Sequence, residues 1–148
     1  MKTISNEIKN FLEQQKLGFV ATVSPDGTPN VSPKGTILAW NENHIVFADI
    51  KSPQTMFNLQ KNPFVEINVV DPFTRKGYRF KGKSEILRDN NEFLKIVADY
   101  KEKGIKNKIN AVVKVEIETI REIISPLYDL GYSEKEIKEK WKKHYLSL

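Results

Sequence analysis

The sequence predicts one α+β domain, a small and mostly antiparallel β-barrel with helices at its periphery. Six stretches alternate apolar and polar residues as strands do. Most links between them are too short for parallel crossovers, and closing the strands into a barrel removes exposed sheet edges. At 148 residues the chain is long enough for one core. No repeat, low-complexity tract or linker divides it, so residues 1–148 are predicted to form a single domain.

The first elements are an amphipathic helix at 3–15 and a strand at 17–23. Gly18 lies just past the helix as a stop signal. Residues 24–27, Ser-Pro-Asp-Gly, follow the strand and have the chemistry of a tight turn. The predicted apolar face of the helix consists of Ile4, Ile8, Phe11 and Leu12.

The second predicted strand runs over 29–40, and it contains two residues that weaken a strand. Pro33 and Gly35 would both disturb a central ladder, so they indicate an edge strand, a bulge or a close approach by a ligand. The polar turn that follows leads into a third strand at 44–50.

The third strand runs directly into a predicted helix at 53–61. Ser52 is a good N-cap, and Pro53 suits the first helical position. The early N–H groups, those of Gln54 and Thr55, have no acceptor within the helix and lie at the positive end of its dipole. Together with two hydroxyls and the Lys51 ammonium, they form a candidate anion site. The alternative is an ordinary capped surface helix.

Five further elements complete the pattern. Strands are predicted at 64–70, 78–87 and 111–117 from their alternation. A helix ending near Gly104 begins with a capping-box pattern from Asp89 to Glu92. A C-terminal helix at about 133–146 begins with a second such pattern, from Ser133 to Glu136.

Composition excludes several function classes. There are no cysteines, and the two histidines, His44 and His144, lie a hundred positions apart, so no metal site is expected. No segment is apolar enough for a signal peptide or a membrane span, which favours a cytoplasmic protein without a membrane partner. The net charge of +5 would suit an anionic ligand. Much of the excess charge lies in the C-terminal helix among glutamates, which disfavours nucleic-acid binding.

Three blocks in this order resemble the pyridoxamine 5′-phosphate oxidase-related, FMN-binding split-barrel family. The resemblance extends over roughly residues 5–120. The blocks are LGFVATVSPDGTPNVSPKG at 17–35, IVFADIKSPQTMFNLQKNP at 45–63 and GYRFKGKSEIL at 77–87. It implies a six-stranded split barrel that pairs as a homodimer, with FMN in grooves at the subunit interface.

The resemblance also implies a set of cofactor-binding residues. Lys34 and its neighbours would lie along the flavin ring, and the end of the third strand would contact the ring or the ribityl chain. The start of the helix at 53–61 would surround the phosphate. The full set is Ser32, Lys34, Gly35, Ala48, Asp49, Lys51, Ser52, Gln54, Thr55 and Asn58.

One departure from the family pattern concerns charge. Many relatives place an arginine and a lysine just inside the phosphate-binding helix, where Pro53 and Thr55 stand closest here. Charge compensation would then fall on Lys51, with Lys34 or a basic side chain of the partner subunit as alternatives. The C-terminal part has no recognisable pyridoxamine phosphate-binding set, which argues against true pyridoxamine phosphate oxidase activity.

The resulting hypothesis is an FMN-dependent oxidoreductase that exchanges electrons or hydride with a small organic partner. No catalytic residue is assigned, because the cofactor supplies the redox chemistry. Alternatives on the same fold are a non-catalytic flavin store or sensor, a deazaflavin enzyme and a haem-binding protein. The lack of a well-placed histidine or cysteine counts against axial haem ligation.

Overall fold

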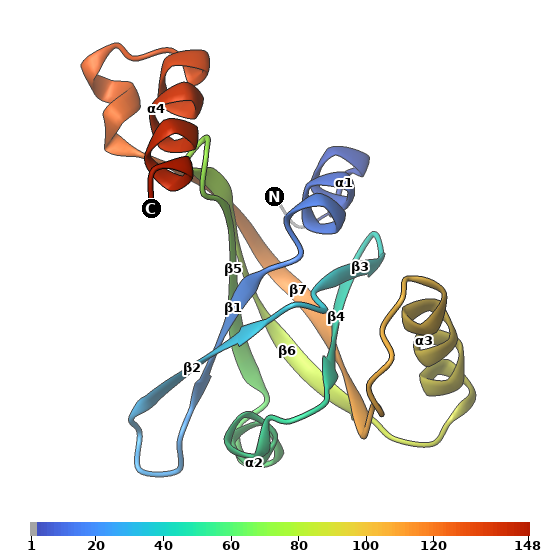
Figure 1. Cartoon of the computed structure of the whole chain (residues 1–148). Helices are drawn as coiled ribbons and strands as arrows, with labels where there is room; N and C mark the ends of the chain where they lie inside the picture. The colour runs from blue at the N-terminus through green and yellow to red at the C-terminus, as the bar shows by residue number, and fades with distance from the viewer. Residues whose placement is uncertain (1–2) are drawn as a thin grey trace.

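The computed structural model describes residues 3–148 and confirms an α+β fold with an antiparallel sheet and peripheral helices (Figure 1). The strands are β1 (Gly18–Val23), β2 (Pro29–Lys34), β3 (Leu38–Asn41), β4 (His44–Asp49), β5 (Phe64–Asp71), β6 (Lys76–Leu87) and β7 (Ala111–Ile124). The helices are α1 (Asn6–Gln15), α2 (Pro53–Lys61), α3 (Asn91–Glu102) and α4 (Glu134–Leu146), with a 3₁₀ turn, η1 (Pro126–Leu130), before α4.

The sheet order explains how the barrel closes. All paired strands are antiparallel, in the order β2-β1-β5-β6-β7-β4-β3. The two edge strands, β2 and β3, are consecutive in the chain and are joined by Gly35, Thr36 and Ile37. The sheet therefore curls until its edges meet at this link. The single strand predicted at 29–40 is wrong in this respect, because the chain crosses there from one edge of the sheet to the other.

The main core fills the barrel. Strands β4 to β7 supply its centre, with Ile45, Phe47, Ile67 and Phe80 fully enclosed. On β7 the predicted inward residues Ala111, Val113, Val115 and Ile117 are all buried. The buried side chains of α1, Ile8 and Leu12, join this core from one end.

A second apolar cluster lies between α3 and the outer face of the sheet. It joins Ile96 and Tyr100 of α3 to Val46 and Ala48 of β4 and to Val112 of β7. Strand β4 and the first residues of β7 are therefore covered on both faces, which explains the continuous apolar runs at 45–48 and 111–113.

The start of α4 follows the predicted capping chemistry, and the start of α3 follows it with a shift of one residue. The Ser133 hydroxyl accepts from the Glu136 N–H (3.2 Å), which confirms Ser133 as the N-cap of α4, and it donates to the Glu136 carboxylate (3.1 Å), which in a full capping box would accept from the serine backbone N–H instead. Helix α3 begins one residue later than predicted: Asn90, not Asp89, is the N-cap, and its side chain accepts from Phe93 N–H (2.8 Å).

The C-terminal unit, η1 and α4, lies on the β5–β6 hairpin, far from α2 (Figure 1). The Arg75 guanidinium stacks on the Trp141 ring, 3.7 Å from its centroid, and donates to the Tyr145 hydroxyl (3.1 Å). Lys76 pairs with Glu134 at 3.2 Å. Strand β7 extends seven residues beyond its predicted end at 117 and carries the chain to this unit. Within residues 3–148, no helix is both long and apolar enough to cross a membrane.

Candidate functional site

The junction between β4 and α2 has the predicted layout but not the predicted cap. Helix α2 begins at Pro53, and Ser52 occupies the N-cap position. Its side chain, however, makes no capping hydrogen bond, and its backbone (φ −139°, ψ 57°) differs from the usual extended N-cap. The serine that was predicted to satisfy the helix start therefore leaves it open.

The Ser52 hydroxyl instead accepts a hydrogen bond from the Lys34 ammonium, which also donates to Ser32 Oγ (2.9 Å). Lys34 is only 8% exposed. It forms no ion pair with any carboxylate among residues 3–148. A buried ammonium whose partners are two neutral hydroxyls lacks a counter-charge, and burial of a charge is costly without one.

The pKa of Lys34 reflects this environment. Burial lowers the pKa of its ammonium, and the negative charge of Asp49 opposes that shift only in part. Asp49 is half-buried at the end of β4, on the same side of the strand as Phe47. An anion placed beside Lys34 would supply the missing charge.

The helix start offers donors to the same anion. The N–H groups of Gln54 and Thr55 have no acceptor in the described chain, since the first helical bond is from Met56 N–H to Ser52 O (3.0 Å). Thr55 is 2% exposed, so its surroundings are dry. Buried ammonium, hydroxyl and helix dipole together fit a phosphate group. Lys51 is exposed and forms no ion pair among residues 3–148, whereas the buried Lys34 is hydrogen-bonded to the N-cap residue of this helix.

Asn58 lies beneath the site and makes three hydrogen bonds. It is fully buried, its amide donates to Thr22 Oγ1 (3.0 Å) and Ser24 Oγ (3.3 Å), and its oxygen accepts from Gln54 Nε2 (2.8 Å). These contacts tie α2 to β1 and hold the Gln54 side chain at the surface. Asn58 therefore supports the helix start from below.

The predicted ring-contacting segment lies along the link between the sheet edges. Ala48 N–H donates to Thr36 Oγ1 (2.9 Å), which joins the link to β4. Gly35 is exposed, its φ is not positive, and an added Cβ would meet only the Lys16 carbonyl oxygen, at an ordinary 3.5 Å. Neither the fold nor the backbone conformation demands a glycine at position 35.

Sequence reasoning missed three polar residues of this region: Thr22, Ser24 and Thr36. Two of them, Thr22 and Thr36, are buried. A single threonine in a strand-like segment does not show from sequence whether its side chain is buried or exposed. On β6, Arg79 and Lys81 are exposed and contact Glu66 at 3.1 and 3.7 Å, so these basic side chains lie on a solvated face of the sheet.

Comparison with known proteins identifies relatives of this arrangement. The model of the "Pyridoxamine 5'-phosphate oxidase" family (PNPOx_N) matches residues 4–124. The crystal structure of HupZ from Group A Streptococcus is similar, with a TM-score of 0.74 and 30% identity over 82% of this chain and 95% of that chain. No curated protein matches the sequence.

Two more distant structures share the fold. An FMN-binding protein from Syntrophomonas wolfei has a TM-score of 0.69 at 13% identity, covering 80% of this chain and 84% of its own. An F420 reductase has a TM-score of 0.60 at 24% identity, covering 80% of this chain and 98% of its own.

Proposed function

Because the chain belongs to the pyridoxamine 5'-phosphate oxidase family, with its FMN-binding split-barrel fold, we propose that it binds FMN, with the phosphate at the start of α2. One observation carries the proposal: the buried Lys34 ammonium has only hydroxyl partners and stands next to the unpaired N–H groups of Gln54 and Thr55. A phosphate dianion would satisfy both.

The flavin ring then extends along the link between the sheet edges. The absence of a side chain at Gly35 leaves room for a flat ligand against the backbone, although the fold itself would accept alanine there. Ala48, Asp49 and Ser32 border the same region and remain candidates for ring or ribityl contacts. Bound there, the flavin would supply the redox chemistry, while the protein holds and orients it.

We propose further that the protein is an oxidoreductase that passes electrons or hydride between FMN and a small organic molecule. Family membership supports this class, and the F420 reductase on the same fold supports deazaflavin as the second candidate cofactor. A flavin store or sensor would use the same binding residues without turnover. A haem protein would need an axial ligand such as histidine, and the two histidines lie away from the start of α2, His44 at the opposite end of β4 and His144 in α4.

A homodimer is part of this proposal. Apolar side chains gather on the outer face of β1, β2 and β5, where a monomer would leave them in water; Val31, on β2, is 61% exposed. The others on this face are Phe19, Val23, Phe64 and Val70. A second copy would cover them and bring basic side chains toward the flavin.

Val31→Glu is expected to yield a monomer in sedimentation velocity, because it puts a charge in the centre of this apolar face. A monomeric wild-type protein would contradict the proposed dimer.

The decisive experiment compares FMN with riboflavin, which differs only by the phosphate. Apoprotein is titrated with each, following quenching of flavin fluorescence. If the anion site is correct, FMN binds at least about 100-fold more tightly, a difference of nearly 3 kcal/mol. Equal affinities would refute the phosphate site. The visible spectrum of the purified protein adds a check, because a single deazaflavin band or a Soret band would identify a different cofactor.

Turnover is tested separately. Bound FMN is reduced without oxygen, and its reoxidation by candidate organic acceptors is compared with that of free FMN. Reoxidation accelerated by the protein supports the oxidoreductase. Reoxidation that is never faster than that of the free cofactor would favour the store or sensor.

A further inference from the structure

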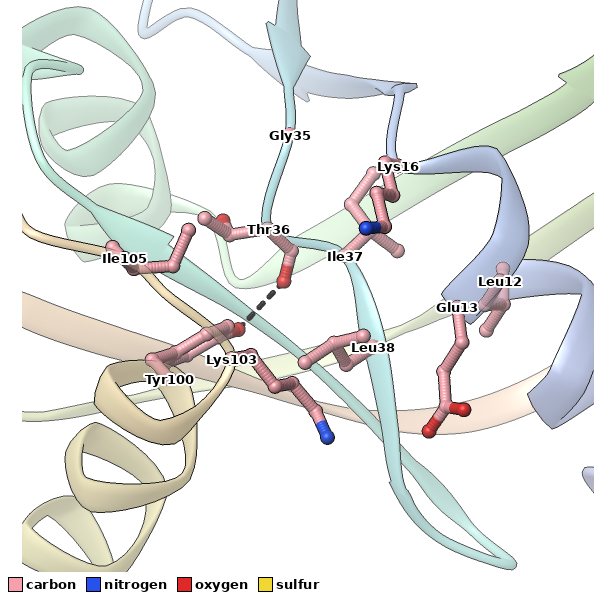
Figure 2. Close-up of a pocket in the computed structure, with 10 residues that line it drawn as sticks. All are labelled: Leu12, Glu13, Lys16, Gly35, Thr36, Ile37, Leu38, Tyr100, Lys103 and Ile105. Carbon is pink, nitrogen blue, oxygen red and sulfur yellow. Dashed lines mark hydrogen bonds between the residues drawn. The ribbon is translucent and has the colours of Figure 1, made fainter.

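A cavity of about 500 Å³ lies beside the proposed cofactor site, and the proposed function leaves it without a ligand. It opens between the last turn of α1, the link between the sheet edges and the end of α3 (Figure 2). This volume is within the range of pockets for small organic molecules. Gly35, which directly follows Lys34, is part of its lining, so the cavity and the anion site meet along one short stretch of backbone.

The wall of this cavity is held from two sides. Thr36 accepts a hydrogen bond on its hydroxyl from Ala48 N–H (2.9 Å) and another on its carbonyl from the Tyr100 hydroxyl (2.7 Å). Tyr100 is fully buried, and burial raises the pKa of its phenol, so it remains a donor at every working pH. The dashed line in Figure 2 marks this contact between two residues that line the cavity. A wall fixed in this way is preformed for a ligand.

The lining is apolar inside and charged at the rim. Leu12, Ile37, Leu38 and Ile105 supply the apolar part. The charged groups are two lysines and one glutamate, Lys16 and Glu13 from α1 and Lys103 from the end of α3 (Figure 2). Lys16 forms no ion pair within residues 3–148, and Lys103 contacts only Asp99 of its own helix, at 3.7 Å.

We propose that this cavity binds a small organic carboxylate with an aromatic or branched apolar body. The apolar body would pack on the leucine and isoleucine side chains, while the carboxylate would lie between Lys16 and Lys103. The proposal that the cavity binds a carboxylate rests on the cavity alone. The further step, that the bound acid exchanges electrons with the flavin, rests on the proposed function, because that function puts a redox cofactor beside Gly35.

The main competing chemistry is a cationic ligand, since Glu13 and the carboxyl ends of α1 and α3 are also near the rim. Three probes separate the two: benzoate, benzylamine and benzyl alcohol share one body and differ in charge. Each is titrated into ¹⁵N-labelled full-length protein, and amide shifts are followed by NMR. We expect benzoate to shift the amides of Leu12, Gly35 and Ile105 saturably, and to bind at least about fivefold more tightly than the other two.

The variants address the same question from the protein side. Lys16→Gln with Lys103→Gln should weaken benzoate binding at least about tenfold, roughly 1.4 kcal/mol. Glu13→Gln, the matched control on the same rim, should leave benzoate binding unchanged or tighten it. Absence of saturable shifts at the lining, or preference for benzylamine, would overturn the proposal.

A final titration separates this proposal from the cofactor proposal. FMN affinity should be unchanged in the double lysine variant, because neither lysine is part of the phosphate site. Benzoate that binds when FMN does not would leave the cavity standing and refute the proposed function. Mutual exclusion of FMN and benzoate would mean that the cavity belongs to the cofactor site, and the second-ligand proposal would be wrong.

Discussion

Helices α2 and α4 are attached to the rest of the fold through different kinds of contact. Helix α2 is attached on a fully buried face: Met56 and Leu59 join the main core, and between them the enclosed Asn58 donates to Thr22 of β1. Helix α4 stacks Trp141 on Arg75 at the tip of a hairpin, and its single buried residue is Ile137. The family match ends at residue 124, so α2 lies inside the shared fold and α4 outside it.

The two helices also differ in whether their polar groups have partners within the chain. At α4 the charged side chains of the helix are exposed to water, and Glu134 also pairs with Lys76 at 3.2 Å. At α2, in contrast, a buried ammonium and two amides have no charged partner. Buried polar groups without partners lower the stability of the fold. Their presence at α2 therefore agrees with the proposal that a bound anion supplies the missing partner.

The largest expected effect tests that explanation directly. Lys34→Met should weaken FMN binding by at least about 100-fold, because removing one member of a buried charge pair costs about 2–5 kcal/mol. Lys61→Met, at the exposed far end of α2, is the matched control and should change nothing. Fluorescence titration measures both. If Lys34→Met kept wild-type affinity, the comparison between the two helices would lose its basis.

The second prediction concerns the support beneath α2. Asn58→Ala removes three hydrogen bonds and leaves the hydroxyls of Thr22 and Ser24 without this partner. The free energy of unfolding should fall by about 2–3 kcal/mol, measured by urea denaturation of the apoprotein. Gln60→Ala, exposed on the same helix, should cost only a few tenths of a kcal/mol. A loss no larger than that of Gln60→Ala would show that the buried network is not what attaches α2.

The third prediction is a pH dependence that comes from Lys34. Its pKa lies below the ordinary value of 10.5 in the free protein and should rise when a phosphate supplies a counter-charge. Below the lowered pKa both states hold the proton, so affinity does not depend on this group. Above it the free protein must take the proton up again on binding, so FMN affinity should fall by up to about tenfold per pH unit.

Riboflavin provides the reference for this experiment, because it carries the same ring without the phosphate. The ratio of the two affinities is measured from neutral pH to 10.5, and Lys34→Met should abolish its decline. A ratio that stays constant over this range in wild-type protein would exclude Lys34 from phosphate binding.

The smallest effect is expected at α4. Trp141→Ala should reduce the free energy of unfolding by about 1 kcal/mol, since the stacked Arg75 is only half-buried. A double-mutant cycle with Arg75→Ala measures the coupling. FMN affinity should not change in either variant. A tenfold weaker FMN affinity would mean that α4 contributes to the cofactor site, which would remove the distinction drawn between the two helices.

Much of this arrangement could be predicted from local sequence. Helix α2 has the predicted bounds, because Ser52-Pro53 is an unambiguous start signal. The direction of Lys34 could not be predicted. In β2 the apolar residues Pro29, Val31 and Pro33 point outward, and Asn30, Ser32 and Lys34 turn toward the interior. Hydrophobic patterning would choose the reverse, since it assumes that the apolar face is the one packed on the chain's own core.

The failure to predict the division of 29–40 has a related cause. Pro33 and Gly35 correctly signalled an irregularity, but local sequence does not say which strand a segment pairs with. Only the register of β1 with β2 and of β4 with β3 shows that this stretch serves both edges of the sheet. The capping of α4 was readable, whereas its place on the β5–β6 hairpin depends on the long-range contact with Arg75.

The prolines of β2 have a consequence for self-association. An edge strand with free amides can template strand addition by other molecules, the first step toward fibrils. Pro29 and Pro33 carry no N–H, so β2 has fewer backbone donors than an ordinary strand, as is typical of edge strands. The other edge strand, β3, has only four residues. Addition of strands from other molecules is therefore disfavoured at both borders of the sheet, so the homodimer proposed above would form through the faces of the sheet rather than through its edges.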